Sequence, residues 1–514
     1  MNDSGDEKQT GRQLVLFLGL FALVKVAIHL STLYLGPYGY FRDEFYYLDC
    51  AANLSWGYVD NPPLAPFILA IVRATLGDSI LAIRLPAILA GGGTVFMAGL
   101  IAAELGGGRF AQGLACLSVI AAPVFLGMSS FFSMNPIDYL LWTIAAYILV
   151  RIIKTDNARL WLWFGLVAGL GLQNKLSMAF FGGMVAAGLL LTPQRKFYAD
   201  KHLWIGGLIA CLIFLPNIFW QMKCGWPTLE FMHDTSLYKN IPEPLPKFLV
   251  NQFLFIGPLV APVWIAGLLY ALFSKSGRKY RIFAFVYIGL LAVFYASNGK
   301  PYYVAPIYPA MLALGAVSLE QATARRRWPR YALPALIIVT GVLLSPHAMP
   351  VLSPEGMIKL QNAMSFKAPQ QERAHAGLLP QHIGDRLGWN EFVAMMTDAY
   401  GRLDPADRAR CSILVSNYGE AGSLNLFGPK LGLPRAVSGY MSYYVWGPGS
   451  MDGACVLAYW PDRKTLDDVF EQVTELARFT HPYVMERQNN RPLYLCRNLR
   501  MPIKDAWPRF KRYW

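Results

Sequence analysis

Residues 13–35 read QLVLFLGLFALVKVAIHLSTLYL, and residues 40–47, which follow after a short turn, read YFRDEFYY. The first stretch is apolar and long enough to cross a bilayer as one helix. The second places two carboxylates, Asp43 and Glu44, among aromatic side chains. This order predicts a membrane helix that ends in a pair of acids at the membrane surface.

The composition predicts an integral membrane protein. Hydrophobic residues make up 55% of the chain and charged residues 15%, and apolar runs of spanning length recur as far as residue 346. The formal net charge is +14, but the basic residues are spread over short loops between the apolar runs. That distribution is typical of membrane orientation and argues against a nucleic-acid partner. No small-residue cleavage site follows the first run, which indicates a retained helix.

Eleven membrane-spanning helices are expected, and the loops between them differ in charge. The loops on one side carry 17 Lys and Arg residues, from Lys8 to Arg330, so the positive-inside rule assigns that side to the cytoplasm. Asp43 and the C-terminus then lie outside a plasma (cell inner) membrane. The expected spans are 13–35, 79–103, 110–127, 137–153, 160–173, 176–192, 203–221, 248–273, 282–297, 303–321 and 331–346.

The chain divides into a membrane part, 1–346, and an extracytoplasmic α/β domain, 347–514. Within the first outer loop, 36–78, we expect two interfacial helices joined at the prolines 62–63. After residue 347 the long apolar runs stop, and short strand-like stretches alternate with helical patterns. Strands are expected at 411–416, 435–438 and 454–459, and a helix at 466–479. Three cysteines in this domain permit a disulfide, with the pairing left open.

Polar residues in the outer loops suit the transfer of a sugar from a phosphate carrier. Such a transfer needs a base to take the acceptor's proton, and cations or hydrogen-bond donors to stabilise the leaving phosphate. Asp43 and Glu44 are the candidate catalytic acids, with Asp60 as a third acid. The candidate phosphate contacts are Lys175, Arg84 and Lys300, and the tyrosines Tyr46, Tyr47, Tyr302 and Tyr303 are placed to flank a sugar.

The same residues resemble motifs of the GT-C class of polytopic glycosyltransferases, in particular the protein O-mannosyltransferases and lipid A aminoarabinose transferases. The resemblance implies that Asp43 is the catalytic acid/base. Before Pro-Pro the family commonly has Glu-Lys, whose Lys is held to contact the donor phosphate, where this chain has Asp60-Asn61. The resemblance therefore leaves Lys175 as the candidate phosphate contact. Some relatives hold zinc at this place, which makes Asp60 and His233 weak candidates for a divalent metal. The matching positions are Asp43-Glu44, Tyr47, Asp60 before Pro62-Pro63, Asp138, Gly169 to Lys175, and Tyr302 to Pro306.

Each candidate also has a purely structural interpretation. Asp43 and Glu44 fit the start of an interfacial helix, and Asp60 fits a turn before Asn-Pro. Asp138 fits the N-terminal end of its helix through the helix dipole. Lys175 fits an interface anchor, and the tyrosines fit an aromatic belt.

Two other functional classes remain as alternatives. A transporter or flippase of lipid-linked sugars is expected to place charges near the bilayer midplane and to show related halves, whereas the acids here gather in outer loops. An envelope scaffold or sensor accounts for the outer domain but not for the acids of 36–78. We therefore expect a membrane glycosyltransferase that takes a sugar from a polyprenyl-phosphate donor to a membrane lipid, glycan or protein acceptor.

Overall fold

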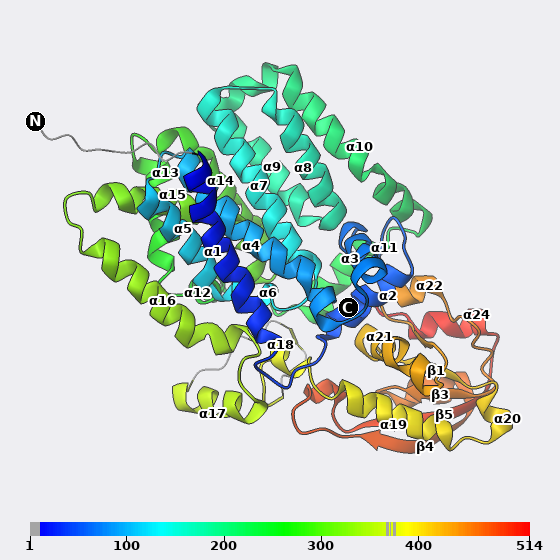
Figure 1. Ribbon diagram of the computed structural model, residues 1–514. Coiled ribbons are helices and arrows are strands. Elements are labelled where there is room, and N and C mark those ends of the chain that lie inside the picture. Colours follow the sequence, from blue (N-terminus) through cyan, green and yellow to red (C-terminus); the bar gives the residue numbers. More distant parts are fainter. Residues whose placement is uncertain (1–10, 366–369, 371, 374–376) are drawn as a thin grey trace, which may run out of the picture.

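The computed structural model describes residues 11–365, 370, 372–373 and 377–514. Long helices form the part of the chain up to Ala348, and a small mixed sheet with its helices forms the C-terminal part (Figure 1). Lys8, which the basic-loop count includes, lies outside the described residues. The expected fold class, a polytopic helical membrane protein with a C-terminal α/β domain, is confirmed.

Seven helical stretches in the described part of the chain are long and apolar enough to cross a membrane. Two further pairs qualify if each bent pair counts as one span: α9 with the following 3-10 turn, bent by 107°, and α12 with α13, bent by 113°. The seven are α1 (Gly11–Thr32), α4 (Ile80–Glu104), α7 (Met134–Thr155), α10 (Lys201–Lys223), α14 with its preceding turn (Arg278–Ala296), α15 with its preceding turn (Pro301–Ala322), and α16 (Pro329–Ala348).

The expected count of eleven spans is therefore not confirmed. Two of the expected spans, α5 (Arg109–Ala121) and α8 (Leu160–Asn174), have 13 and 15 residues, and a bilayer core needs about 20 at 1.5 Å per residue. The other helices of this part are α2 (Arg42–Ala52), α3 (Leu64–Leu76), α6 (Pro123–Met128), α9 (Ser177–Leu190), α11 (Pro227–Asp234), α12 (Leu245–Ile256) and α13 (Ala261–Phe273).

Small residues let the membrane helices pack closely. A Cβ atom at Gly165 of α8 would stand 2.0 Å from the carbonyl oxygen of Gly206 in α10, so the two backbones touch directly. Such contacts take the place of a hydrophobic driving force between helices in lipid. These contacts fix the helix ends from which the connecting loops extend.

The first outer loop folds as expected into two helices separated by the prolines. α2 begins at Arg42, because the Glu44 carboxylate accepts a hydrogen bond from the Phe41 N–H at 2.8 Å, and α3 begins directly after Pro63. α3 ends at Gly77, whose φ of 80° favours glycine. These two helices lie where the long helices meet the C-terminal sheet (Figure 1).

The C-terminal sheet has the strand order β2-β1-β3-β5-β4. β2 (Ala436–Ser438), β1 (Ser412–Val415) and β3 (Val456–Tyr459) are parallel, and β5 (Arg491–Leu499) runs antiparallel to both β3 and β4 (Phe470–Phe479). The helices of this region are α17 (Pro354–Met364), α18 (Gln381–Gly384), α19 (Trp389–Gly401), α20 (Pro405–Arg408), α21 (Tyr418–Phe427), α22 (Ser442–Trp446), α23 (Arg463–Val469) and α24 (Ile503–Ala506).

One element differs from the sequence-based prediction. The helix expected at 466–479 ends at Val469, and β4 begins at Phe470. Pairing with β5, from Phe470↔Leu499 to Phe479↔Arg491, overrides the helix-forming Glu, Gln, Leu and Ala residues of this stretch.

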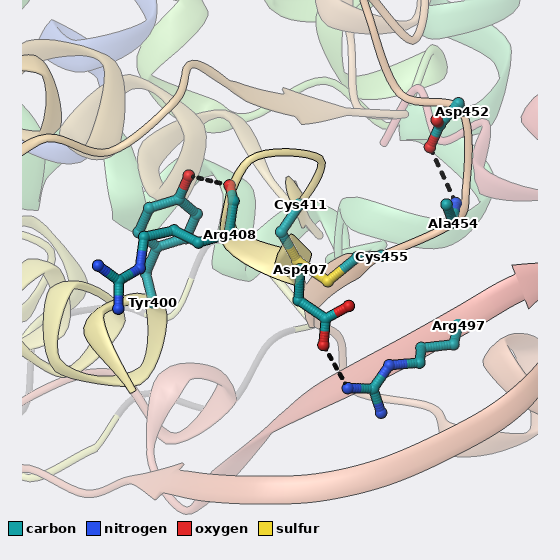
Figure 2. The surroundings of a disulfide bond; sticks show 8 residues. All are labelled: Tyr400, Asp407, Arg408, Cys411, Asp452, Ala454, Cys455 and Arg497. Atoms are coloured by element: carbon teal, nitrogen blue, oxygen red, sulfur yellow. Dashed lines mark hydrogen bonds and ion pairs between the residues drawn. A yellow bond between two sulfur atoms is a disulfide. The ribbon is translucent and has the colours of Figure 1, made fainter. Parts of the chain in front are cut away.

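A disulfide joins Cys411, at the start of β1, to Cys455, just before β3 (Figure 2). It closes a loop with a sequence separation of 44 residues between two strands that lie side by side. An Asp407–Arg497 ion pair ties the segment before β1 to β5 in the same surroundings. The sheet is thus cross-linked along one end.

Candidate functional site

A cavity of about 1200 Å³ opens between the membrane helices, the loops at one end of them and the C-terminal part. Its polar wall includes Asp43, Asp60 and Lys175. Its apolar wall comes from α6, α12 and α16, and includes Val124, Met128, Phe255, Pro258 and Leu344. One space therefore joins acids and a cation to a lining that suits hydrocarbon.

Asp43 lies in the first turn of α2, and about a third of its side chain (34%) is exposed. Its Oδ1 accepts a hydrogen bond from the Tyr418 hydroxyl at 2.7 Å, and the Arg42 Nε lies 3.6 Å from the same oxygen. An ionised carboxylate with one oxygen engaged retains lone pairs that can accept a proton. The geometry suits a general base.

Glu44 faces away from this cavity and is fully buried. Arg84 donates to both of its carboxylate oxygens at 2.8 Å, and the backbone N–H groups of Phe41 and Phe132 donate at 2.8 Å as well. Burial raises the pKa of Glu44, but the Arg84 guanidinium outweighs it, so the pKa lies below its usual value. The sequence predicted Glu44 as a catalytic acid and Arg84 as a phosphate contact. In the structure the two side chains instead form a buried ion pair that joins α2 to α4.

Asp60 is half-buried on the cavity wall. Its Oδ1 accepts from the Tyr46 hydroxyl at 2.7 Å, and the Tyr46 oxygen lies 2.6 Å from the Ser442 hydroxyl of α22. Burial raises the pKa of Asp60 to about 6, against the smaller lowering effect of the Tyr46 hydrogen bond. Its neighbour Asn61 is buried off the cavity wall, where its amide donates to the Pro62 carbonyl at 3.0 Å.

Lys175 follows α8 and lines the cavity. Its ammonium donates to the Asn135 side-chain oxygen at 2.7 Å and lies 5.3 Å from the centre of the Tyr303 ring. Both partners are neutral, and within the described part of the chain Lys175 forms no ion pair. Asp138 is fully buried off the cavity wall, and its two carboxylate oxygens, 2.8 and 2.9 Å from the Ser177 hydroxyl, share that hydroxyl's single proton.

Lys300 also lines the cavity but is paired with Glu372 at 2.7 Å. Lys239 lies 3.6 Å from the same carboxylate. Burial lowers the pKa of Lys300, but Glu372 outweighs it and raises this pKa above its usual value. Burial likewise raises the pKa of Glu372, and the neighbouring cations Lys239 and Lys300 bring it well below its usual value.

Aromatic side chains complete the wall. Tyr302 and Tyr303 pack edge to face with ring centres 5.0 Å apart, next to Lys175 and Lys300. Tyr47 accepts a hydrogen bond from the Met134 N–H at 3.3 Å and lines the cavity too. Rings at this place can pack on the apolar face of a sugar.

The metal prediction remains untested by the geometry. Asp60 and His233 both line the cavity. Among the residues that the structure describes, no three His, Cys, Asp or Glu side chains gather closely enough to hold a metal ion.

Several wall residues were missed by the sequence-based reasoning. Tyr418, Arg42 and Glu372 line the cavity, and Ser442 reaches Asp60 through Tyr46. The sequence marks two stretches of the C-terminal part as either glycan contacts or ordinary core and turn: the aromatic run Tyr440 to Trp446, which includes Ser442, and the YGEAG motif that begins at Tyr418. Nothing in the sequence links it to a site more than 370 residues earlier.

Known proteins resemble this chain in sequence. Residues 60–220 match a family described as dolichyl-phosphate-mannose-protein mannosyltransferase. The lipid A galacturonosyltransferase RgtD of Rhizobium johnstonii is 25% identical over 275 residues, which are 51% of this chain and 56% of the relative. The undecaprenyl phosphate-alpha-4-amino-4-deoxy-L-arabinose arabinosyl transferase 1 of Pseudomonas fluorescens is 22% identical over 276 residues, 50% of this chain and 48% of the relative. The matches thus span about half the length of these curated relatives.

Solved structures resemble it over more of its length. ArnT from Cupriavidus metallidurans, bound to undecaprenyl phosphate, superposes with a TM-score of 0.59 at 14% identity, covering 95% of this chain and 98% of ArnT. The Archaeoglobus fulgidus oligosaccharyltransferase gives 0.51 at 11% identity, covering 80% and 63%. The likeness establishes a shared fold, and the resemblance indicated by the sequence motifs is confirmed.

Proposed function

We propose that this chain is an integral membrane glycosyltransferase. It moves a sugar from a polyprenyl-phosphate donor to a hydroxyl or phosphate of an envelope lipid, glycan or protein. The observation that carries the proposal is the cavity, in which the acids Asp43 and Asp60 and the cation Lys175 share one space with an apolar wall. A lipid acceptor is favoured because one similar protein is named a lipid A galacturonosyltransferase, and a polyprenyl-phosphate donor because another is named for an undecaprenyl phosphate-linked sugar.

In the proposed reaction with a hydroxyl acceptor, the acceptor oxygen forms a bond to the anomeric carbon of the donor sugar. The bond from that carbon to the phosphate oxygen breaks, and polyprenyl phosphate leaves with the electron pair. The acceptor's proton passes to Asp43. A general base of this kind contributes about 10²–10⁴-fold to the rate.

Lys175 is the proposed partner of the leaving phosphate. Negative charge develops on that phosphate, and a cation in a poorly solvated site stabilises it best. The direct contacts of the Lys175 ammonium, Asn135 and Tyr303, are neutral, and the nearby Asp138 carboxylate acts on it without forming an ion pair in the described part of the chain, so its charge is available to a substrate. Lys300 is already neutralised by Glu372.

The apolar wall is the proposed path of the donor's lipid tail. Val124, Phe255 and Leu344 come from helices that lie among the membrane helices. A polyprenyl chain that stays in hydrocarbon keeps its free energy low while its phosphate reaches Lys175. The ArnT structure was solved with undecaprenyl phosphate, which agrees with this arrangement.

The cavity and the C-terminal domain, 347–514, are proposed to face the extracytoplasmic side of the plasma membrane. Two observations support this orientation: the basic loops predicted to be cytoplasmic, and the Cys411–Cys455 disulfide, since disulfides persist in oxidising compartments. Reporter fusions at the C-terminus test it. Activity of a C-terminal reporter that functions only in the cytoplasm would contradict the orientation.

The decisive experiment is transfer by the purified protein in lipid vesicles. Polyprenyl-phosphate donors with neutral, amino and acidic sugars are mixed with lipid A, and products are identified by mass spectrometry. We expect one donor to yield lipid A heavier by one sugar residue, together with free polyprenyl phosphate. A donor that crosses the bilayer intact without product would instead support a flippase.

A further inference from the structure

Tyr418, the first residue of α21, directs its hydroxyl proton to Asp43. Its oxygen lies 2.7 Å from Asp43 Oδ1 and also accepts a hydrogen bond from Arg42 Nη2 at 2.6 Å. A guanidinium can only donate, so the single proton of the Tyr418 hydroxyl is left for the carboxylate. The hydrogen bonds therefore run in one direction, from Arg42 through Tyr418 to Asp43.

Close packing of α21 on α2 makes this contact possible. A Cβ atom at Gly422 would stand 2.6 Å from the carbonyl oxygen of Phe45, and one at Gly419 would overlap the Arg42 side chain. Glycines at these positions let the two helices approach until the Tyr418 hydroxyl reaches Asp43. The Arg42 N–H also donates to the Asp385 carbonyl at 3.0 Å, so C-terminal residues hold the first turn of α2 at two points.

Both close contacts of the Asp43 carboxylate fall on Oδ1. Within the described part of the chain, Oδ2 receives no hydrogen bond. A carboxylate held by one oxygen cannot turn freely, so the other oxygen is presented to a substrate. This asymmetry is what a general base requires, because the accepting oxygen must be within reach of the acceptor's proton.

We propose that Tyr418 is a positioning residue for the transfer reaction, which holds Asp43 by Oδ1 and leaves Oδ2 to accept the proton. The C-terminal domain thereby completes the catalytic site of the membrane part. The inference rests on the proposed function and extends it to a residue 375 positions away in the sequence. The inference also gives a role to the YGEAG motif: its tyrosine makes the contact with Asp43, and its glycines permit the close packing of α21 on α2.

The pH dependence of transfer tests the inference. A hydrogen bond donated to a carboxylate favours its ionised form, so its loss favours the protonated form. Tyr418→Phe should move the acid limb of the kcat/KM profile upward by about one pH unit, as expected for the loss of one hydrogen bond to a charged group. The charged or titratable groups that also act on Asp43 are Arg42, Tyr47, Asp60 and Tyr302; of these, Arg42 loses its Tyr418 acceptor in this variant but keeps it in the 3-fluorotyrosine variant described next.

Tyr443→Phe is the matched control. It removes the same hydroxyl at the same interface, but Tyr443 donates to Asp49, which is not on the cavity wall. We expect this variant to keep the wild-type pH profile. Replacement of Tyr418 by 3-fluorotyrosine, a stronger donor of nearly the same size, should move the acid limb downward and provides a test should Tyr418→Phe not fold.

The outcomes separate this inference from the proposed function. An acid limb that stays in place in both Tyr418 variants would overturn the positioning role, as would a loss by the same factor at every pH. If the wild-type protein transferred sugar from none of the donors, that result would count against the proposed function instead, since the wild type carries no substitution.

Discussion

The Lys175 ammonium donates a hydrogen bond to the Asn135 side-chain oxygen at 2.7 Å. The pair orients the lysine without neutralising it. Lys300, on the same cavity wall, differs because its ammonium lies 2.7 Å from the Glu372 carboxylate. We therefore predict different effects on transfer and on stability when the charge of each lysine is removed.

Lys175→Met should depress transfer strongly while leaving membrane insertion intact. The variant keeps the apolar stem of the side chain but loses the charge that stabilises the leaving phosphate, which typically costs about 10²–10³-fold in kcat. Lys247→Met is the control, because Lys247, in the first turn of α12, is exposed and is not on the cavity wall. Unimpaired transfer by Lys175→Met would return this residue to the role of an interface anchor.

Lys300→Met should reduce stability more than Lys175→Met does. Removal of Lys300 leaves the buried Glu372 carboxylate with more distant cations, namely Lys239 at 3.6 Å, Arg487 at 3.9 Å, and Arg42. A buried charge that loses a hydrogen bond costs about 1–3 kcal/mol. Thermal unfolding in detergent measures the difference, and equal melting temperatures for the two variants would contradict the assignment of Lys300 to an ion pair.

Asp60 should make stability fall as the pH rises from about 4 to 6. Burial raises the pKa of Asp60 to about 6, so in this range the folded state binds a proton that the unfolded state has released. The stabilising effect of the neutral carboxyl is present at low pH and lost as the pH passes 6. Asp60→Asn should therefore gain thermal stability relative to the wild type as the pH increases.

Melting temperatures measured from pH 4 to pH 7 check the Asp60 prediction. Asp468→Asn serves as the control, since Asp468 is exposed and should give the same difference from the wild type at every pH. A constant difference for Asp60→Asn as well would show that the Asp60 carboxyl titrates alike in the folded and unfolded states.

The disulfide should stabilise the C-terminal domain. A cross-link with a sequence separation of 44 residues restricts the unfolded chain and typically contributes about 2–4 kcal/mol. The double variant Cys411→Ser, Cys455→Ser should melt at a lower temperature, and reductant should affect the wild type but not the double variant. Cys496→Ser, at a buried unpaired cysteine of the same sheet, should retain its sensitivity to reductant. A wild type insensitive to reductant would contradict the bond.

Local features of the fold could be predicted from the sequence. The start of α3 directly after Pro62 and Pro63 follows from the sequence, because prolines act on the backbone wherever they occur, whereas α2 ends earlier, at Ala52. The strand β4 could not be predicted, since its residues favour a helix and only pairing with β5 makes them a strand. The number of spans was uncertain because short apolar helices such as α8 are not distinguished from full spans by hydropathy.

The candidate site was predicted in part. Asp43, Asp60 and Lys175 do lie on one cavity wall, and their positions at helix ends near apolar runs made that expectation possible. The family resemblance favoured Asp43 over Glu44, but the ion pair of Glu44 with Arg84 could not be predicted, because it depends on the rotation of α2. Tyr418 could not be found either, since its contact with Asp43 depends on the docking of α21 onto α2.

The most direct test of the account compares wild-type protein with Asp43→Asn in a single-turnover transfer assay, with a polyprenyl-phosphate sugar donor and a lipid A acceptor. The substitution preserves the shape of the side chain and removes its capacity to take a proton. We expect normal membrane insertion and transfer slower by about 10²–10⁴-fold. An Asp43→Asn protein that transfers sugar at the wild-type rate would contradict the central claim.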